Sequence, residues 1–277
     1  MPLVASRALF LHCIAMVIAT AMAALAATAA HADTPPESRL EGAIGLIASN
    51  APEFAGADAR RSKVAPGFFL RYGRLSVTNA SGFVTRRNEE VERGLDFELQ
   101  RSEVFRVNVA LRFDGGRSEG DSPALAGLGD VRATVRTRLS ATWRPLPTWR
   151  VGAAWSLDVL GRGGGSVVDA NVAREFRFSP TTTWAAGAAL SLADARYMQS
   201  YFGVTPAQST ASGYAVFVPH AGLRDASVFA NARHEISPRW VALGGTSFTH
   251  LLGPVAASPH TRRSNSLAVN AGLAWLF

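Results

Sequence analysis

Residues 265–277 alternate apolar side chains with small or polar ones and end on an aromatic residue. Counting back in steps of two from the end gives an apolar face, made of Leu267, Val269, Ala271, Leu273, Trp275 and Phe277. The opposite face is small or polar, with Leu276 as the exception. Because side chains alternate across a strand, this pattern predicts a strand that is apolar on one side. Such a strand suits a transmembrane β-barrel, where the apolar face meets lipid. The alternative is a half-buried edge strand of an ordinary sheet.

The same alternation recurs through most of the chain. It is clearest in residues 104–113, 130–143 and 149–160, where the second face carries arginines or small residues. Weaker versions cover residues 40–48, 64–73, 74–86, 92–101, 166–178, 182–194, 222–235 and 239–251. With the last stretch, these segments predict an all-β fold: one antiparallel transmembrane β-barrel of about 12 strands. An even number of strands is typical of bacterial single-chain barrels.

The connections between these segments alternate in length. After even-numbered strands they are short, at residues 73–74, 100–103, 144–148, 179–181 and 237–238. After odd-numbered strands they are mostly long, at residues 49–63, 114–129, 195–221 and 252–264, with 87–91 and 161–165 as short exceptions. This alternation predicts short periplasmic turns and long outer loops. Near the short turns lie five tryptophans that we expect to form one interfacial rim, namely Trp143, Trp149, Trp184, Trp240 and Trp275.

The first 32 residues have the organisation of a secretory signal peptide. Arg7 precedes an apolar run from residue 8 to about residue 29, and an A-x-A site at residues 30–32 comes before two prolines. We therefore expect a cleaved signal peptide at 1–32 and an outer-membrane β-barrel domain at 33–277, located in the outer membrane of a Gram-negative bacterium. A retained membrane anchor is the alternative. The only cysteine, Cys13, lies inside the signal, so the mature chain is expected to lack disulfides.

Charge and motifs argue against several functional classes. The net charge is +7, but the arginines are mostly scattered singly within strands and form no large cluster, so we expect no nucleic-acid partner. The histidines of the sequence lack the spacing of a metal site. His234 and Ser237 fall on opposite faces of a strand and cannot form a nucleophile–base pair there. We therefore expect a non-enzymatic protein with no catalytic residues, no cofactor-binding residues and no metal site.

The predicted lumen carries charges of both signs. These residues are Arg71, Asp96, Glu98, Arg106, Arg112, Arg132, Arg136, Arg138, Arg150, Asp158, Asp169, Glu175, Arg177, Arg233 and Glu235. The favoured interpretation is a network of ion pairs that braces and partly fills a small barrel. The alternative is a narrow channel for small solutes, anionic ones included, because arginine is in excess.

The longest predicted loop contains a helix signal. Thr205 and Gln208 form a capping box, Pro206 suits the first helical position, and Gly213 suits the end, so we expect about two helical turns between them. Four aromatic residues lie in this loop, namely Tyr197, Tyr201, Phe202 and Tyr214. Packing into the barrel mouth is the favoured role for them, and contact with a partner is the alternative.

The motif at residues 197–213, Tyr-Met…Tyr-Phe-Gly-Val-Thr…Ala-Gln…Ser-Gly, resembles the MipA/OmpV family of outer-membrane proteins, as do residues 52–58 and 221–225. The sequence differs from the family pattern at Phe54 and at residues 254–257. The resemblance implies an outer-membrane barrel surrounded by lipid. It also implies a scaffold that links a murein synthase to a lytic transglycosylase in cell-wall growth, so that murein-processing enzymes are the expected partners.

Overall fold

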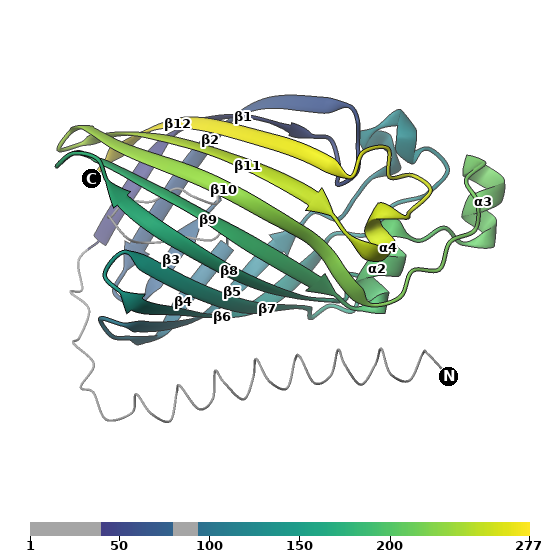
Figure 1. Cartoon of the computed structure of the whole chain (residues 1–277), viewed down its shortest axis with the longest axis horizontal. Helices are drawn as coiled ribbons and strands as arrows, with labels where there is room; N and C mark the ends of the chain where they lie inside the picture. The colour runs from purple at the N-terminus through teal and green to yellow at the C-terminus, as the bar shows by residue number, and fades with distance from the viewer. Residues whose placement is uncertain (1–39, 80–93) are drawn as a thin grey trace.

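A computed structural model describes residues 40–79 and 94–277. The predicted signal peptide lies outside the described residues, as do the connection at 87–91 and parts of the strands predicted at 74–86 and 92–101. Within the described residues, twelve strands form one closed barrel in which each strand pairs with its neighbour in the chain (Figure 1). The first strand pairs antiparallel with the last and closes the cylinder. The predicted antiparallel barrel is therefore confirmed.

The strands are β1 (Leu40–Pro52), β2 (Arg60–Tyr72), β3 (Leu75–Thr78), β4 (Gly94–Arg101), β5 (Phe105–Asp114), β6 (Thr134–Leu146), β7 (Trp149–Asp158), β8 (Ser166–Arg177), β9 (Thr182–Ala193), β10 (Gly222–Ser237), β11 (Trp240–Leu251) and β12 (Asn265–Leu276). The helices are α2 (Ala195–Phe202), α3 (Pro206–Ser212) and α4 (Gly253–Ala256), with short 3-10 turns η1 (Glu119–Asp121) and η2 (Pro123–Leu125). Among the described residues, none of the helices is both long enough and apolar enough to cross a membrane.

The last residues close the barrel against the first strand. The N–H of Gly42 donates to the carbonyl of Phe277, and the N–H of Phe277 donates to the carbonyl of Gly42, each at 3.0 Å. A Cβ at Gly42 would lie 2.3 Å from Cζ of Phe277, so any other residue there would require this aromatic ring to move. The ring also stacks on Trp275, with centroids 5.3 Å apart. The terminal strand that the sequence singles out is thus the one that seals the cylinder.

The outer surface of the barrel is apolar. Ile44 and Leu46 of β1 and Leu273 of β12 are exposed on this surface, as the alternation predicts. The tryptophans also lie where they were expected, because Trp240 pairs directly with Trp275 and Trp149 follows the turn after β6. An apolar band bordered by aromatic residues fits the hydrocarbon layer of a bilayer.

The one break in the alternation of β12 has a structural cause. Leu276 points into the lumen, where it packs with Ala43, Phe69 and Ala274 in a buried cluster near the inner end of the barrel. The lumen is therefore apolar at this point, and a leucine on the lumen face is buried there.

Several element boundaries differ from the sequence-based expectations. The β1–β2 hairpin extends further than expected, so the connection covers 53–59 instead of 49–63. Strand β6 begins at Thr134, not at residue 130, because Val131 instead bridges to Arg117 within the third outer loop. Arg132 consequently lies in that loop, exposed, and does not line the lumen. The helix α2 was not predicted.

Candidate functional site

Outer loops pack together over one end of the barrel. Helices α2 and α4 lie at this end, which is the right-hand end in Figure 1, and α3 stands further out. Side chains of α2 and α4 pack against strand residues in a buried apolar cluster, formed by Val167, Ala193, Met198, Phe202, Leu251 and Val255. A second cluster is formed by Leu125, Leu128 and Val204, with Phe54, Tyr214 and Phe217 against it. We call this packed assembly of residues 53–59, 115–133, 194–221 and 252–264 the outer cap.

A histidine lies at the centre of the outer cap. His260 is completely buried; its Nδ1 lies 3.1 Å from Oγ of Ser258 and its Nε2 lies 3.2 Å from the carbonyl oxygen of Tyr201. Its ring is nearly parallel to that of Phe202, with centroids 6.1 Å apart. Burial, together with the nearby charge of Arg117, lowers the pKa of His260 to about 4. The ring is therefore neutral at physiological pH, and both nitrogens are engaged inside the protein.

Polar contacts fasten α2 to the barrel wall. Tyr201 donates its hydroxyl to Asp114 at 3.3 Å, and Arg136 donates to the same carboxylate at 2.6 Å. Burial and the charge of Asp114 raise the pKa of Tyr201 to about 12, so the phenol remains a donor. The guanidinium groups of Arg136 and Arg224 lie 5.5 Å and 5.6 Å from the ring centre of Tyr197. These are cation–π contacts between the wall and the helix.

Below α2 the network continues along the lumen side of five neighbouring strands, β6 to β10. Arg224 donates to Oγ of Ser191 at 3.1 Å, and Ser191 donates to Asp169 at 2.6 Å. Asp169 also accepts from Arg138 at 2.7 Å, and Arg138 reaches Ser156 at 2.9 Å. We call this chain of contacts the polar layer. It supports the interpretation that the charged lumen residues brace the barrel.

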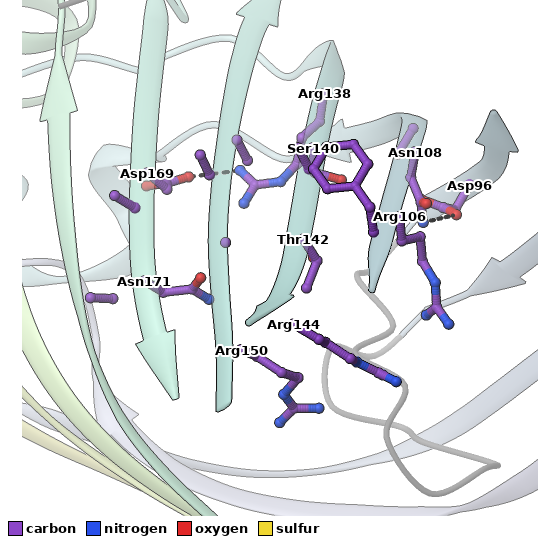
Figure 2. Close-up of a pocket in the computed structure, with 18 of the residues that line it drawn as sticks. Asp96, Arg106, Asn108, Arg138, Ser140, Thr142, Arg144, Arg150, Asp169 and Asn171 are labelled. Atoms are coloured by element: carbon purple, nitrogen blue, oxygen red, sulfur yellow. Dashed lines mark hydrogen bonds and ion pairs between the residues drawn. The ribbon is translucent and has the colours of Figure 1, made fainter. Parts of the chain in front are cut away.

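A cavity of about 230 Å³ lies on the other side of the polar layer. It extends from Arg138, Asp169 and Ser191 to the turn at residues 102–104, at the inner end of the barrel. Figure 2 shows the polar side chains that line it, namely Asp96, Arg106, Asn108, Arg138, Ser140, Thr142, Arg144, Arg150, Asp169 and Asn171. We call this cavity the inner vestibule.

The other predicted lumen residues, apart from Arg132, stay on the lumen side of their strands. Arg71 and Glu98 line a smaller cavity beside the inner vestibule. Asp158 lies at the outer end, where it accepts from the N–H of Gly164 at 2.8 Å. Arg112, Glu175, Arg177, Arg233 and Glu235 keep their lumen register, and Arg233 pairs with Glu235. Within the described part of the chain, no group of three or more His, Cys, Asp or Glu residues is arranged to hold a metal ion.

Sequence reasoning missed two arginines that matter here. Arg144 was assigned to a turn, but β6 continues to Leu146, so the even-numbered lumen face that includes Arg138 also includes Arg144. Extending that alternation by one step would have found it. Arg224 reaches the lumen through an irregularity in pairing between Leu223 and Asp225, for which the sequence gives no signal.

Comparisons with solved structures give other outer-membrane barrels. The NanC porin matches with a TM-score of 0.42 at 8% identity, over 86% of this chain and 99% of that one. The CymD monoaromatic hydrocarbon channel matches with a TM-score of 0.42 at 12% identity, over 88% of each chain. An anion-selective porin from Comamonas acidovorans matches with a TM-score of 0.39 at 9% identity, over 86% of this chain and 99% of that one. The barrel fold itself follows from the strand pairing.

Comparison with curated proteins gives no significant match. The family model described as "MltA-interacting protein MipA" matches residues 44–277, which include all but the first four residues of the barrel and the whole outer cap. The resemblance inferred from the loop motif is therefore confirmed, and the outer-membrane location follows from it together with the apolar barrel surface. The chain is an outer-membrane β-barrel protein that belongs to the MltA-interacting protein (MipA) family.

Proposed function

We propose that the protein is a non-enzymatic scaffold that holds murein-processing enzymes at the periplasmic side of the outer membrane. The observation that carries this proposal is the family match over residues 44–277, because the family is described by its interaction with MltA. A lytic transglycosylase and a murein synthase are the partners that this relationship suggests.

The geometry of the outer cap supports a role without catalysis. Ser258 and His260 are the serine and histidine that the outer cap brings together, and their side chains have the spacing of a nucleophile and a base. Both residues are buried, with exposed fractions of 4% and 0%, and Nε2 of His260 faces a backbone carbonyl. A substrate has no access to such a pair, so its role is to hold the cap together.

The inner rim is the surface that faces the periplasm. Its turns are short, but each of several turns carries an exposed apolar side chain, namely Val104, Leu146, Phe178 and Ile236. Phe178 is the most exposed of these, at 84%. An enzyme bound to this rim would contact side chains from several turns at once, because no single turn is long enough to form a binding loop.

Affinity capture of the full-length protein in detergent tests the scaffold proposal. We expect purified MltA-type transglycosylase and murein synthase to be retained by the wild type. The double variant Phe178→Ser, Ile236→Ser removes apolar area from the inner rim and should retain less. The control Val218→Ser removes an exposed apolar side chain from the outer cap and should change nothing. The scaffold proposal fails if the wild type retains neither enzyme, or if Val218→Ser reduces retention as much as the double variant of the inner rim does.

A narrow channel for small solutes is the alternative function. The position of α2 favours the scaffold, because the helix contacts β5, β6 and β10 at the outer end of the barrel, where a solute would have to pass. Single-channel recording on the purified protein separates the two functions. A stable conductance with anion preference that Arg136→Glu reduces would favour the channel, and no stable conductance is expected for a scaffold.

We also propose that export removes residues 1–32 as a signal peptide. The support is the order of Arg7, the apolar run and the A-x-A site in the sequence. N-terminal sequencing of the protein isolated from outer membranes should begin near Asp33. A start at Met1 would mean that the segment is retained as an anchor.

A further inference from the structure

The inner vestibule is a polar recess that faces the inner end of the barrel. Residues of the turn 102–104 line its inner part, and the polar layer of Arg138, Asp169 and Ser191 lines its deepest part. The helix α2 lies beyond that layer, on the outer side. A solute that enters from the periplasm therefore meets a recess whose far wall is made of ion pairs.

Positive charge gathers in this recess. Four arginines line it, against three acidic residues. Two of the four are in ion pairs, Arg138 with Asp169 at 2.7 Å and Arg106 with Glu98 at 3.0 Å. Arg144 lies close enough to Arg106 and Arg150 for their charges to repel one another, while Glu175 attracts it. In a concave site with low-dielectric walls, neighbouring guanidinium groups produce a focused positive potential. An anion placed among them would relieve the mutual repulsion.

Two of the acidic residues of the lining are held by other side chains of the wall. Asp169 accepts from Arg138 and from Ser191, at 2.7 Å and 2.6 Å. Asp96 accepts from the amide nitrogen of Asn108 at 2.8 Å, as the dashed line in Figure 2 marks. These bonds hold both carboxylates against their own strands.

Neutral donors complete the recess. Ser140, Thr142 and Asn171 line it between the arginines (Figure 2). The side chain of Asn171 has room because residue 152 is glycine: a Cβ there would lie 2.1 Å from Oδ1 of Asn171. A pocket that combines guanidinium, amide and hydroxyl donors is suited to oxygen atoms that carry negative charge.

We propose that the inner vestibule is a binding site for a small solute that carries a carboxylate or a phosphate group, reached from the periplasmic side. Arginine binds both groups through two parallel N–H donors, which gives the site its preference for planar or tetrahedral oxyanions. The volume of 230 Å³ equals the space that about eight water molecules take in the liquid, so the ligand is a small organic acid or a simple phosphate. This site is independent of the scaffold function, since it lies inside the barrel.

Calorimetric titration of the full-length protein in a neutral detergent tests this proposal. Succinate and inorganic phosphate are the two anionic probes, and succinamide is the neutral match for succinate. The variants are Arg144→Gln and Arg150→Gln, alone and together, with circular dichroism to confirm that each barrel is folded. Arg239→Gln is the matched control, because Arg239 is an exposed arginine of the inner rim that does not line the vestibule.

We expect one saturable site per chain for at least one of the two anions, and none for succinamide. Each single substitution should weaken binding by about tenfold or more, the double variant should abolish it, and Arg239→Gln should leave it unchanged. The anion that binds more tightly identifies the group that the site prefers. Absence of saturable binding by both anions, or an equal loss in Arg239→Gln, would overturn the proposal.

Discussion

The two ends of this barrel differ in how their strands are connected and in what occupies the lumen. At the outer end the strands are joined by long loops that pack into a core of their own, with Met198, Phe202 and His260 fully or almost fully buried. At the inner end the strands are joined by short turns, and the space between them is the inner vestibule, lined by arginines and amides. The polar layer of Arg138, Asp169, Ser191 and Arg224 separates the two.

This difference shows how one cylinder can be rigid at one end and open at the other. A loop becomes ordered when it buries apolar side chains, and the outer loops supply those side chains themselves. The inner turns are too short to fill the lumen, so on the side formed by β4 to β9 the lumen keeps its polar side chains and its space. The lumen face of the strands therefore supports the outer cap at one end and lines the inner vestibule at the other. Substitutions at one end should leave the other end unchanged.

The largest effect is expected from Phe202→Ala, which removes the aromatic ring from the centre of the outer cap. Phe202 packs on Met198 and Val255 and stacks on His260. Loss of a buried phenylalanine typically costs about 3–5 kcal/mol, because a cavity remains. Hydrogen exchange should show residues 195–221 opening much more often, while β1 and β12 stay protected. Phe178→Ala, at the exposed inner rim, is the matched control, and an equal effect there would contradict the comparison.

Acid should loosen the outer cap selectively. The pKa of His260 is about 4 in the folded protein, below its ordinary value of 6.5, so the unfolded cap takes up the proton first. The stability that the neutral ring contributes is fully present above about pH 6.5 and is lost as the pH falls toward 4. The loss amounts to about 3 kcal/mol. Exchange of cap amides between pH 7 and pH 4 should show this trend, and His260→Gln should remove most of it.

Asp114→Asn should detach α2 from the barrel wall. The substitution removes the negative charge that pairs with the buried Arg136, and it weakens the hydrogen bond from Tyr201. We expect a local cost of about 2 kcal/mol, since one partner of a largely buried ion pair is lost. Protease cleavage within residues 195–221 should become faster. Asp58→Asn, at an exposed position of the first outer loop, provides the comparison, and equal cleavage in both variants would argue against the role of Asp114.

The smallest effect is expected at α3, which stands away from the barrel. Thr205 caps this helix: its side-chain hydroxyl accepts a hydrogen bond from the N–H of Gln208. The side-chain oxygen of Gln208 in turn accepts one from the N–H of Thr205. Thr205→Ala should therefore destabilise α3 locally by about 1 kcal/mol. Exchange of amides in residues 206–212 should rise, and those of α2 should not. A matching rise in α2 would mean that the two helices open together.

Period-two alternation was sufficient to predict the barrel because lipid imposes a uniform requirement on one face of every strand. The same rule applied to Arg106, Arg138 and Arg150 placed them correctly in the lumen. The capping residues Thr205 and Gly213 predicted α3 correctly, because helix ends have a local signature. Strand alternation and helix capping are both set within a single segment, the first by the lipid or the lumen on either side of the strand and the second by residues at the helix ends.

The outer cap was harder to predict, because it depends on contacts between loops far apart in the sequence. Asp194 caps α2 and offered a local signal, but the helix is ordered by packing against residues 251–256. Burial of His260 requires loops 194–221 and 252–264 to meet, which no periodicity encodes. The inner vestibule was missed for a similar reason, since the three strands β5, β6 and β7 have to be placed side by side before its four arginines are seen to share one space.

The most direct test of the account is the accessibility of the lumen from each side. Thr142→Cys places a thiol in the inner vestibule, and Thr210→Cys places one on the exposed helix α3. A bulky, membrane-impermeant maleimide added to intact cells should label Thr210→Cys rapidly and Thr142→Cys hardly at all. Opening the periplasm should then make Thr142→Cys reactive. Rapid labelling of Thr142→Cys in intact cells would show that the outer end is open, and would contradict the division of the barrel into a packed outer cap and an open inner vestibule.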